Sequence, residues 1–227
     1  MTMTRVSAGE TGAFRLAPSM LSADFSSLAE SVAVVDAQTD WLHVDVMDGH
    51  FVPNVTIGPP VVKALRPHST KFFDCHLMMT EPERYLEAFA AAGADGCTVH
   101  VEIGRTSQIL QVARELGLRV GLAANPDTDF AAVAPFLGEI DLLLLMTVFP
   151  GFGGQKFIGE VMAKVEAARR EIDTQNLPVD IEVDGGIDES TIGIARAAGA
   201  NVFVAGNAIF GAADPLAAAT RLRSVGS

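Results

Sequence analysis

The sequence predicts a single (β/α)8 barrel (TIM barrel), an α/β fold in which eight parallel strands alternate with helices. Eight short apolar or β-branched runs recur along the 227 residues, and segments with helical spacing lie between them. No linker, repeat or low-complexity segment divides the chain, and barrels of this kind routinely form one domain of this size. We therefore expect one domain over residues 1–227, in which residues 1–12 form a flexible N-terminal extension.

The strands are expected where apolar and β-branched residues cluster, at residues 14–20, 41–46, 71–76, 95–101, 118–123, 141–147, 179–184 and 201–206. Helices are expected at residues 26–37, 81–92, 105–117, 188–198 and 213–223, and in the segment after Gly159. Gly93, Gly117 and Gly199 follow helical runs, which is where glycine ends helices. The main alternative is an open doubly wound sheet, in which weaker runs such as 118–123 would not be strands.

Composition excludes several classes of protein. The chain has 28 acidic and 16 basic side chains, a net charge of −12 and 49% hydrophobic residues, which is typical of a folded acidic protein. Nucleic acid is not an expected partner, because no basic patch would neutralise its phosphates. The longest apolar stretch, around Leu142–Met146, is too short to span a membrane, and the polar N-terminus lacks the core of a secretion signal. We expect a cytoplasmic protein in which Cys75 and Cys97 are buried free thiols.

Ionisable side chains collect at the carboxyl ends of four expected strands, where barrels of this fold carry their functional residues. The period of two places His43 and Asp45 on one face, towards the barrel interior. The remaining residues are Asp74, His76, His100, Glu102, Glu182 and Asp184. Burying such groups is costly unless they are paired or bind a metal, and imidazoles with carboxylates suit Zn²⁺, Fe²⁺, Mn²⁺ or Co²⁺. The cluster therefore predicts one divalent metal ion.

Simpler interpretations of these residues stay open. A lone buried histidine such as His76 is more often a hydrogen-bonded core residue than a metal ligand. His100 and Glu102 either orient a metal ligand from behind or form an ion pair at the barrel rim. Three methionines lie at or just after strand ends, where they either fill the core or form a polarizable wall that shields a metal site from water: Met47, Met78 and Met146.

Glycine-rich turns follow the last three expected strands, at Gly151 to Gly154, at Gly185 with Gly186, and at Gly206 with Asn207. Glycine lets backbone N–H groups approach an anion, and the loops after strands 7 and 8 of such barrels commonly bind phosphate. Amide groups and a metal would hold an anionic ligand although the chain has only four lysines, of which Lys156 alone lies near these loops. The glycines also predict that residues 147–156 form a lid that closes over the site.

Six motifs stand in the chain in this order: APSMLSADF (17–25), HVDVMDGHFVPN (43–54), DCHLM (74–78), PGFGGQ (150–155), EVDGG (182–186) and AGNAIF (205–210). Together, from about residue 14 to 211, they closely resemble the ribulose-phosphate 3-epimerase family. That family interconverts D-ribulose 5-phosphate and D-xylulose 5-phosphate in the pentose phosphate pathway and, in carbon-fixing organisms, in the Calvin cycle. The resemblance implies a metal-dependent isomerase that acts on a small sugar phosphate and forms homo-oligomers.

The resemblance also implies a role for each matching residue. The metal ligands would be His43, Asp45, His76 and Asp184, with Asp45 and Asp184 as the acid/base pair. Substrate contacts would come from Ser19, His76, Gly151, Phe152, Gly153, Gly154, Asp184, Gly185, Gly186, Gly206 and Asn207. Two positions depart from the family: Asn207 replaces the usual Ser, which affects a side-chain contact to phosphate, and Phe149 stands where Asn or Glu is common.

The implied reaction removes a proton from C3 beside the carbonyl and returns it to the opposite face through a cis-enediolate. Asp45 and Asp184 would flank the sugar, one ionised and the other protonated. The alternatives are a 3-epimerase of D-allulose 6-phosphate and a non-catalytic barrel that binds metal and sugar phosphate. Related decarboxylases and synthases would need a Lys within Asp-x-Lys-x-x-Asp, which Asp45-Val-Met-Asp48 lacks.

Overall fold

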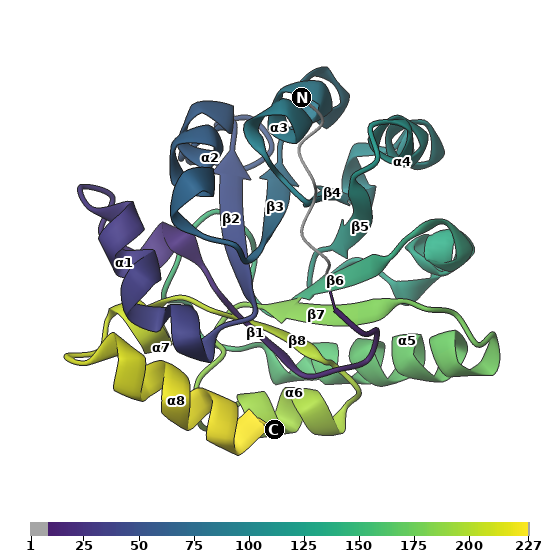
Figure 1. The fold of residues 1–227 in the computed structure, drawn as a ribbon. Coiled ribbons are helices and arrows are strands. Elements are labelled where there is room, and N and C mark those ends of the chain that lie inside the picture. Colours follow the sequence, from purple (N-terminus) through teal and green to yellow (C-terminus); the bar gives the residue numbers. More distant parts are fainter. Residues whose placement is uncertain (1–8, 227) are drawn as a thin grey trace.

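The computed structural model describes residues 9–226, in which eight parallel strands form a barrel surrounded by helices (Figure 1). The strands are β1 (Arg15–Pro18), β2 (Trp41–Met47), β3 (Phe72–Met78), β4 (Gly96–His100), β5 (Arg119–Ala124), β6 (Leu142–Met146), β7 (Asp180–Asp184) and β8 (Val202–Ala205). They pair in the order β1-β8-β7-β6-β5-β4-β3-β2, and a parallel bridge between Ser19 and His43 joins the two ends of this order. The predicted barrel is confirmed, and the open doubly wound sheet is wrong.

The helices are α1 (Leu28–Val35), α2 (Pro59–Leu65), α3 (Leu86–Ala92), α4 (Thr106–Glu115), α5 (Met162–Thr174), α6 (Ile192–Ala197), α7 (Asn207–Phe210) and α8 (Pro215–Gly226). The sequence did not predict α2, because its seven residues make only about two turns and show little of the helical period. It also did not predict α7, a single turn of four residues. Between β5 and β6 the chain forms only 3-10 turns, at Phe130–Ala132 and Ala134–Glu139.

The strands are buried on both faces, and β2 illustrates how the two faces differ. Leu42, Val44 and Val46 pack into the large apolar layer between the strands and the surrounding helices. The alternate residues point into the barrel, where Trp41 joins a smaller apolar cluster near the amino ends of the strands. His43 and Asp45 follow on the same inner face, so the barrel interior changes from apolar to polar towards the carboxyl ends.

A buried charge cluster closes the amino-terminal end of the barrel. Asp180 forms ion pairs with Arg15 (3.1 Å) and Arg119, and it accepts a hydrogen bond from the Gly12 N–H at 2.8 Å. Both guanidinium groups also lie over the Trp41 ring, 5.2 and 5.3 Å from its centroid. Gly12, at the end of the expected N-terminal extension, is therefore hydrogen-bonded to the barrel. Residues 1–8 of that extension lie outside the described residues.

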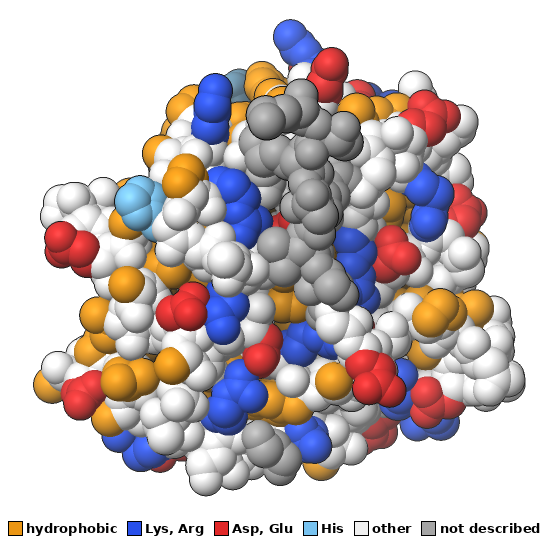
Figure 2. Space-filling view, viewed as in Figure 1, with side chains coloured by type: hydrophobic (Ala, Val, Ile, Leu, Met, Phe, Trp, Pro, Cys, Tyr) orange, Lys and Arg blue, Asp and Glu red, His pale blue; other side chains and the backbone are white. Residues whose placement is uncertain are grey.

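The surface in the view of Figure 2 carries acidic and basic side chains that intermingle, with hydrophobic side chains between them. Within residues 9–226 no helix is both long and apolar enough to cross a membrane. Cys75 and Cys97 are buried and free, as predicted.

We predict that Asp180→Ala lowers the free energy of unfolding by about 3–5 kcal/mol, because it removes the buried carboxylate that pairs with two guanidinium groups, those of the buried Arg15 and the partly buried Arg119. Glu189→Ala, which breaks a half-exposed pair with Arg221, should cost only about 0.2–1 kcal/mol. Denaturant unfolding measures both. A loss at Asp180 no larger than that at Glu189 would show that the cluster does not stabilise the barrel.

The effect of Asp180→Ala should also depend on pH. Burial disfavours the charged carboxylate, but the Gly12 N–H, Arg119 and Arg15 outweigh it and hold the pKa of Asp180 below its ordinary 3.8. Asp180 therefore stabilises the fold above pH 3.8 and loses that contribution as the pH falls through its lower folded-state pKa. The stability difference between variant and wild type should shrink in that acidic range, as unfolding curves recorded down the pH scale would show.

Candidate active site

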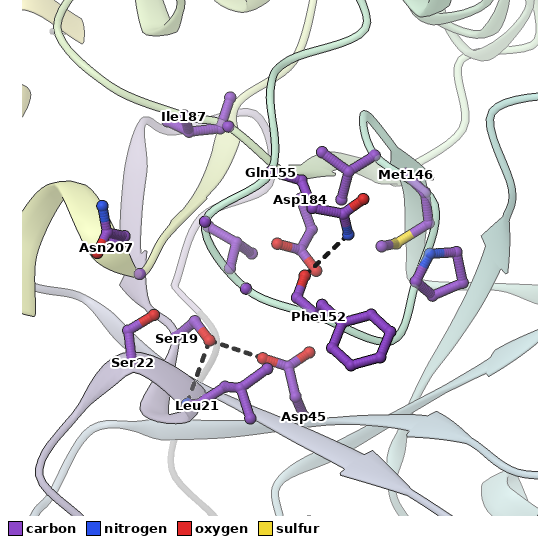
Figure 3. Close-up of a pocket in the computed structure, with 18 of the residues that line it drawn as sticks. Ser19, Leu21, Ser22, Asp45, Met146, Phe152, Gln155, Asp184, Ile187 and Asn207 are labelled. Atoms are coloured by element: carbon purple, nitrogen blue, oxygen red, sulfur yellow. Dashed lines mark hydrogen bonds between the residues drawn. The ribbon is translucent and has the colours of Figure 1, made fainter. Parts of the chain in front are cut away.

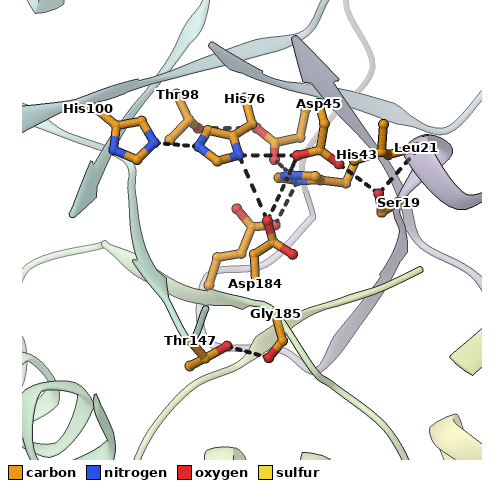
Figure 4. Close-up of polar contacts among 12 residues, drawn as sticks. Ser19, Leu21, His43, Asp45, His76, Thr98, His100, Thr147, Asp184 and Gly185 are labelled. Atoms are coloured by element: carbon orange, nitrogen blue, oxygen red, sulfur yellow. Dashed lines mark hydrogen bonds and ion pairs between the residues drawn. The ribbon is translucent and has the colours of Figure 1, made fainter. Parts of the chain in front are cut away.

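Four of the ionisable residues expected at the strand ends converge inside the carboxyl end of the barrel (Figure 4). Asp45 Oδ1 lies 3.3 Å from both His43 Nε2 and His76 Nδ1. Asp184 Oδ2, from β7 across the barrel, lies 3.8 and 3.9 Å from the same two nitrogens. One ligand atom from each residue lies within 4.8 Å of the others, close enough for the four to share one ion.

The state of His43 fits a cation at the centre of this cluster. Its Nδ1 pairs with Asp74 Oδ2 at 2.8 Å, whereas its fully buried Nε2 has no hydrogen-bond partner and is directed at the carboxylates. Burial disfavours a charged ring, yet Asp45, Glu182 and Asp74 raise the pKa of His43 well above its ordinary 6.5. The surrounding carboxyl groups thus favour a positive charge at this position, and a metal ion bound to Nε2 would supply it.

The two aspartates have opposite tendencies to hold a proton. Burial disfavours the charged form of Asp45, but His43 outweighs it through its charge and its hydrogen bond and holds the pKa of Asp45 well below its ordinary 3.8. Burial, followed by the negative charge of Asp45, raises the pKa of Asp184 to about 7. At pH values below about 7, one carboxylate and one carboxyl group therefore face each other, and an acid/base pair needs this combination. The Ser19 hydroxyl donates to Asp45 Oδ2 at 2.6 Å.

A second pair of carboxyl groups lies deeper in the barrel, behind His43. Glu182 Oε1 is 3.4 Å from His43 Nδ1, and Asp74 accepts a bond from Thr98 Oγ1 at 3.3 Å. Burial and then the nearby charge of Asp74 raise the pKa of Glu182 to about 8, so this side chain stays protonated at neutral pH. The sequence marked both residues as ionisable strand residues but assigned neither a role.

A cavity of about 370 Å³ opens above the cluster (Figure 3). Its lining includes these residues expected at the site: Ser19, Asp45, Met47, Met78, Met146, Gly151, Phe152, Gly153, Gly154, Asp184, Gly185, Gly186, Gly206 and Asn207. His43 and His76 are not in the lining and are fully buried beneath its floor. Of the four clustered residues, the two aspartates are therefore the ones that reach the cavity, and the expected direct contact of His76 with a substrate stays a prediction.

Glycine shapes the end of the cavity formed by the loops after β7 and β8. Gly186 has a φ of +66°, and a Cβ there would lie 2.4 Å from the backbone nitrogen of Phe157. A Cβ on Gly206 would lie 2.5 Å from Ser22 Oγ, which places the Ser22 hydroxyl beside this turn. The sequence did not single out Ser22. Its position three residues after Ser19, within one 3-10 turn (Met20–Ser22), was the available signal.

The loop between β6 and α5 covers one side of the cavity. Gln155 Nε2 donates to the carbonyl oxygens of Phe149 and Phe152, at 2.6 and 2.9 Å, and so holds the loop tip together. Asn54 Nδ2, from the loop after β2, donates to Gly151 O at 2.8 Å. The Phe149 side chain is 51% exposed and does not line the cavity, so this departure from the family pattern leaves the lining unchanged.

Solved structures with the same fold share the barrel at low sequence identity. A 3-hexulose-6-phosphate synthase superimposes with a TM-score of 0.71 at 22% identity, covering 94% of this chain and 100% of the other. KGPDC from Streptococcus mutans, solved in complex with D-R5P, has a TM-score of 0.72 at 15% identity and covers 93% and 96%. These likenesses define the chain as a (β/α)8 barrel protein.

Sequence comparison identifies the family within that class. The model of the "Ribulose-phosphate 3 epimerase family" matches residues 15–210. The cytoplasmic isoform of ribulose-phosphate 3-epimerase from Oryza sativa subsp. japonica is 49% identical over 209 residues, 89% of this chain and 90% of that protein. The Bacillus subtilis enzyme is 44% identical over 212 residues, 92% and 98% of the two chains. The chain belongs to the ribulose-phosphate 3-epimerase family, and the expected enzyme class, an isomerase, is confirmed.

Proposed function

We propose that the protein is a metal-dependent ribulose-phosphate 3-epimerase that interconverts D-ribulose 5-phosphate and D-xylulose 5-phosphate. The observation that carries the proposal is the pair Asp45 and Asp184, which reach one cavity from β2 and β7 with pKa values shifted in opposite directions. The family membership and the names of the relatives support the substrate. The homo-oligomeric state and the cytoplasmic location implied at the sequence level stay predictions.

The chain's own groups fit one divalent ion. His43 Nε2, His76 Nδ1 and one oxygen from each aspartate would hold it, which leaves the second oxygen of each aspartate for proton transfer. When bound, such an ion supplies Lewis-acid stabilisation of the negative charge that develops on the sugar oxygens. The donor set of two imidazoles and two carboxylates suits Zn²⁺, Fe²⁺, Mn²⁺ or Co²⁺.

The two aspartates exchange protons with C3 from opposite sides of the sugar. The ionised Asp45 accepts the C3 proton as the C–H bond breaks, and the bond's electron pair moves into the cis-enediolate. The protonated Asp184 then donates its proton to C3 on the other face, where the new C–H bond forms. The turnover ends with Asp45 protonated and Asp184 ionised, which is the starting state for the reverse reaction. β2 and β7 are three steps apart around the barrel, so their side chains approach from nearly opposite directions.

Water must be kept away from the planar intermediate, because it would exchange or misplace the proton. Met47, Met78 and Met146 line the cavity beside the aspartates and are nearly fully buried, so they offer an apolar, polarizable wall without exchangeable protons. The glycine loop, Gly151 to Gly154, closes the remaining side. The turns at Gly185, Gly186, Gly206 and Asn207 form the end of the cavity that we assign to the phosphate group.

We predict that Asp45→Asn and Asp184→Asn each lower epimerisation by roughly 10²- to 10⁴-fold, because each variant lacks one proton-transfer group. Turnover is measured in deuterated water with D-ribulose 5-phosphate, together with incorporation of deuterium at C3. Asp173→Asn, on the exposed face of α5, is the matched control and should retain normal rates. A near-normal rate from Asp45→Asn would refute its role as a base, and binding without any C3 exchange in the wild type would favour the non-catalytic alternative.

Removal of the metal should abolish activity. Thorough chelation is expected to stop turnover, and addition of one equivalent of Zn²⁺, Fe²⁺, Mn²⁺ or Co²⁺ in turn should restore it to an extent that identifies the effective ion. The same protein assayed with D-allulose 6-phosphate separates the pentulose from the hexulose alternative by their kcat/KM values. Activity that survives chelation, with metal content verified as negligible, would remove the ion from the mechanism.

The phosphate end of the cavity is tested by Gly186→Ala. The added Cβ would meet the Phe157 backbone and force the two loops apart, so competitive inhibition by inorganic phosphate should weaken. Gly104→Ala is the control: its φ of +68° imposes the same strain of about 1–3 kcal/mol, but no atom lies within 4 Å of the new Cβ. Equal phosphate inhibition of both variants would place the phosphate group elsewhere.

A further inference from the structure

A further histidine, His100, lies directly behind His76, on the side away from Asp45 (Figure 4). His100 Nε2, from β4, lies 2.8 Å from His76 Nε2, and the two rings stack with centroids 5.0 Å apart. On its far side, His100 Nδ1 lies 3.0 Å from Glu102 Oε2. His100 is fully buried, and the Phe51 ring packs against it at a centroid distance of 4.6 Å. A continuous line of contacts therefore runs from Glu102 through His100 to His76 and Asp45.

Glu102 is the acceptor for three donors. Besides His100 Nδ1, the Asn125 N–H donates to its Oε1 at 2.7 Å, and the Thr128 hydroxyl donates to the same oxygen. Burial favours a neutral carboxyl group, but these three partners lower the pKa of Glu102 to about 2, so it is an ionised carboxylate. Lys164 Nζ fixes the loop that supplies two of the donors, through bonds to Asn125 O (2.7 Å) and Pro126 O (3.1 Å).

An acceptor at the start of this line dictates where each proton lies. A carboxylate cannot donate, so His100 Nδ1 carries the hydrogen, and His100 Nε2 accepts in the 2.8 Å contact with His76 Nε2. His76 must then donate from Nε2. With the ring hydrogen on Nε2, His76 Nδ1 presents a lone pair. That lone pair faces Asp45 Oδ1 at 3.3 Å, an arrangement of two acceptors that only a cation between them would stabilise.

We propose that Glu102 and His100 are positioning residues that fix the tautomer and ring orientation of His76, so that Nδ1 is held ready as a metal ligand. The proposal rests on the metal site of the proposed function. Of the two interpretations that the sequence left open, the proposal takes the first, because His100 is fully buried and contacts His76 as well as Glu102. Carboxylate partners of this kind orient metal-bound histidines and raise their affinity for the ion.

Glu102→Gln is the discriminating variant, because it keeps the shape of the side chain and removes its ability to accept on both sides. With its one oxygen towards Asn125 N–H, the glutamine presents an NH₂ group to His100 Nδ1 and favours the reversed tautomers of His100 and His76. We expect Co²⁺ or Zn²⁺ to bind roughly 10- to 100-fold more weakly, as measured by competition with a chelator. Glu81→Gln is the control: Glu81 is an exposed residue after β3, and the substitution removes the same charge. This variant should bind the metal ion as tightly as the wild type does.

Histidine tautomers give a readout that does not depend on activity. Two-bond ¹⁵N–¹H spectra of the wild type should show His100 protonated on Nδ1 and His76 protonated on Nε2, and Glu102→Gln should reverse or mix these states. Glu102→Asp, which keeps the acceptor, serves if the glutamine variant does not fold, and should keep the wild-type tautomers. Equal metal affinity of wild type and Glu102→Gln, or a wild-type His100 protonated on Nε2, would overturn the proposal. A wild type that binds no metal but shows the expected tautomers would instead contradict the metal site of the proposed function.

Discussion

The constraint on which the site depends is an excess of buried negative charge inside the carboxyl end of the barrel. Asp45, Asp74, Glu182 and Asp184 crowd around His43 and His76, and their carboxyl oxygens lie 2.8 to 3.9 Å from the ring nitrogens of these two histidines. Carboxyl groups this close cannot all ionise in a dry interior, so protonation states diverge: the pKa of Asp45 falls while those of Asp184 and Glu182 rise. The asymmetry that proton transfer requires thus arises from burial together with crowding.

The barrel produces this crowding through the ordinary alternation of a β-strand. Along β2 the inner face carries Trp41, His43, Asp45 and Met47 in succession, while the outer face carries residues that hold the helices. Neighbouring strands pair in parallel register, Asp45 opposite His76 and His43 opposite Asp74, so each polar layer is assembled from adjacent strands at one height. Apolar packing at the amino ends of the strands and between the strands and the helices offsets the free energy cost of burying the polar layers near the carboxyl ends.

Much of this arrangement could be predicted from the sequence, because it depends on local periodicity. The runs of β-branched and apolar residues located all eight strands, and the period of two placed His43 and Asp45 together. The rest depends on distances between strands and on ring orientation, which spacing does not encode. The contact of His100 Nε2 with His76 Nε2 requires two specific rotamers across β3 and β4, and Ser22 comes near Gly206 only when β1 and β8 pair. α2 was missed because seven residues show too little of the helical period.

The negative charge of buried carboxylates is neutralised differently at the two ends of the barrel. At the amino-terminal end, Asp180 has its cations built in as Arg15 and Arg119, so its charge is neutralised by residues that also pack on Trp41, and its pKa stays low. At the carboxyl end, the carboxyl groups face two histidines instead of guanidinium groups, and the buried Nε2 of His43 is unbonded. The guanidinium groups are permanently charged, so the cluster at the amino-terminal end keeps one charge state and serves to stabilise the fold. At the carboxyl end the carboxylates are neutralised by protons or a metal ion, so that cluster can change its protonation state during turnover.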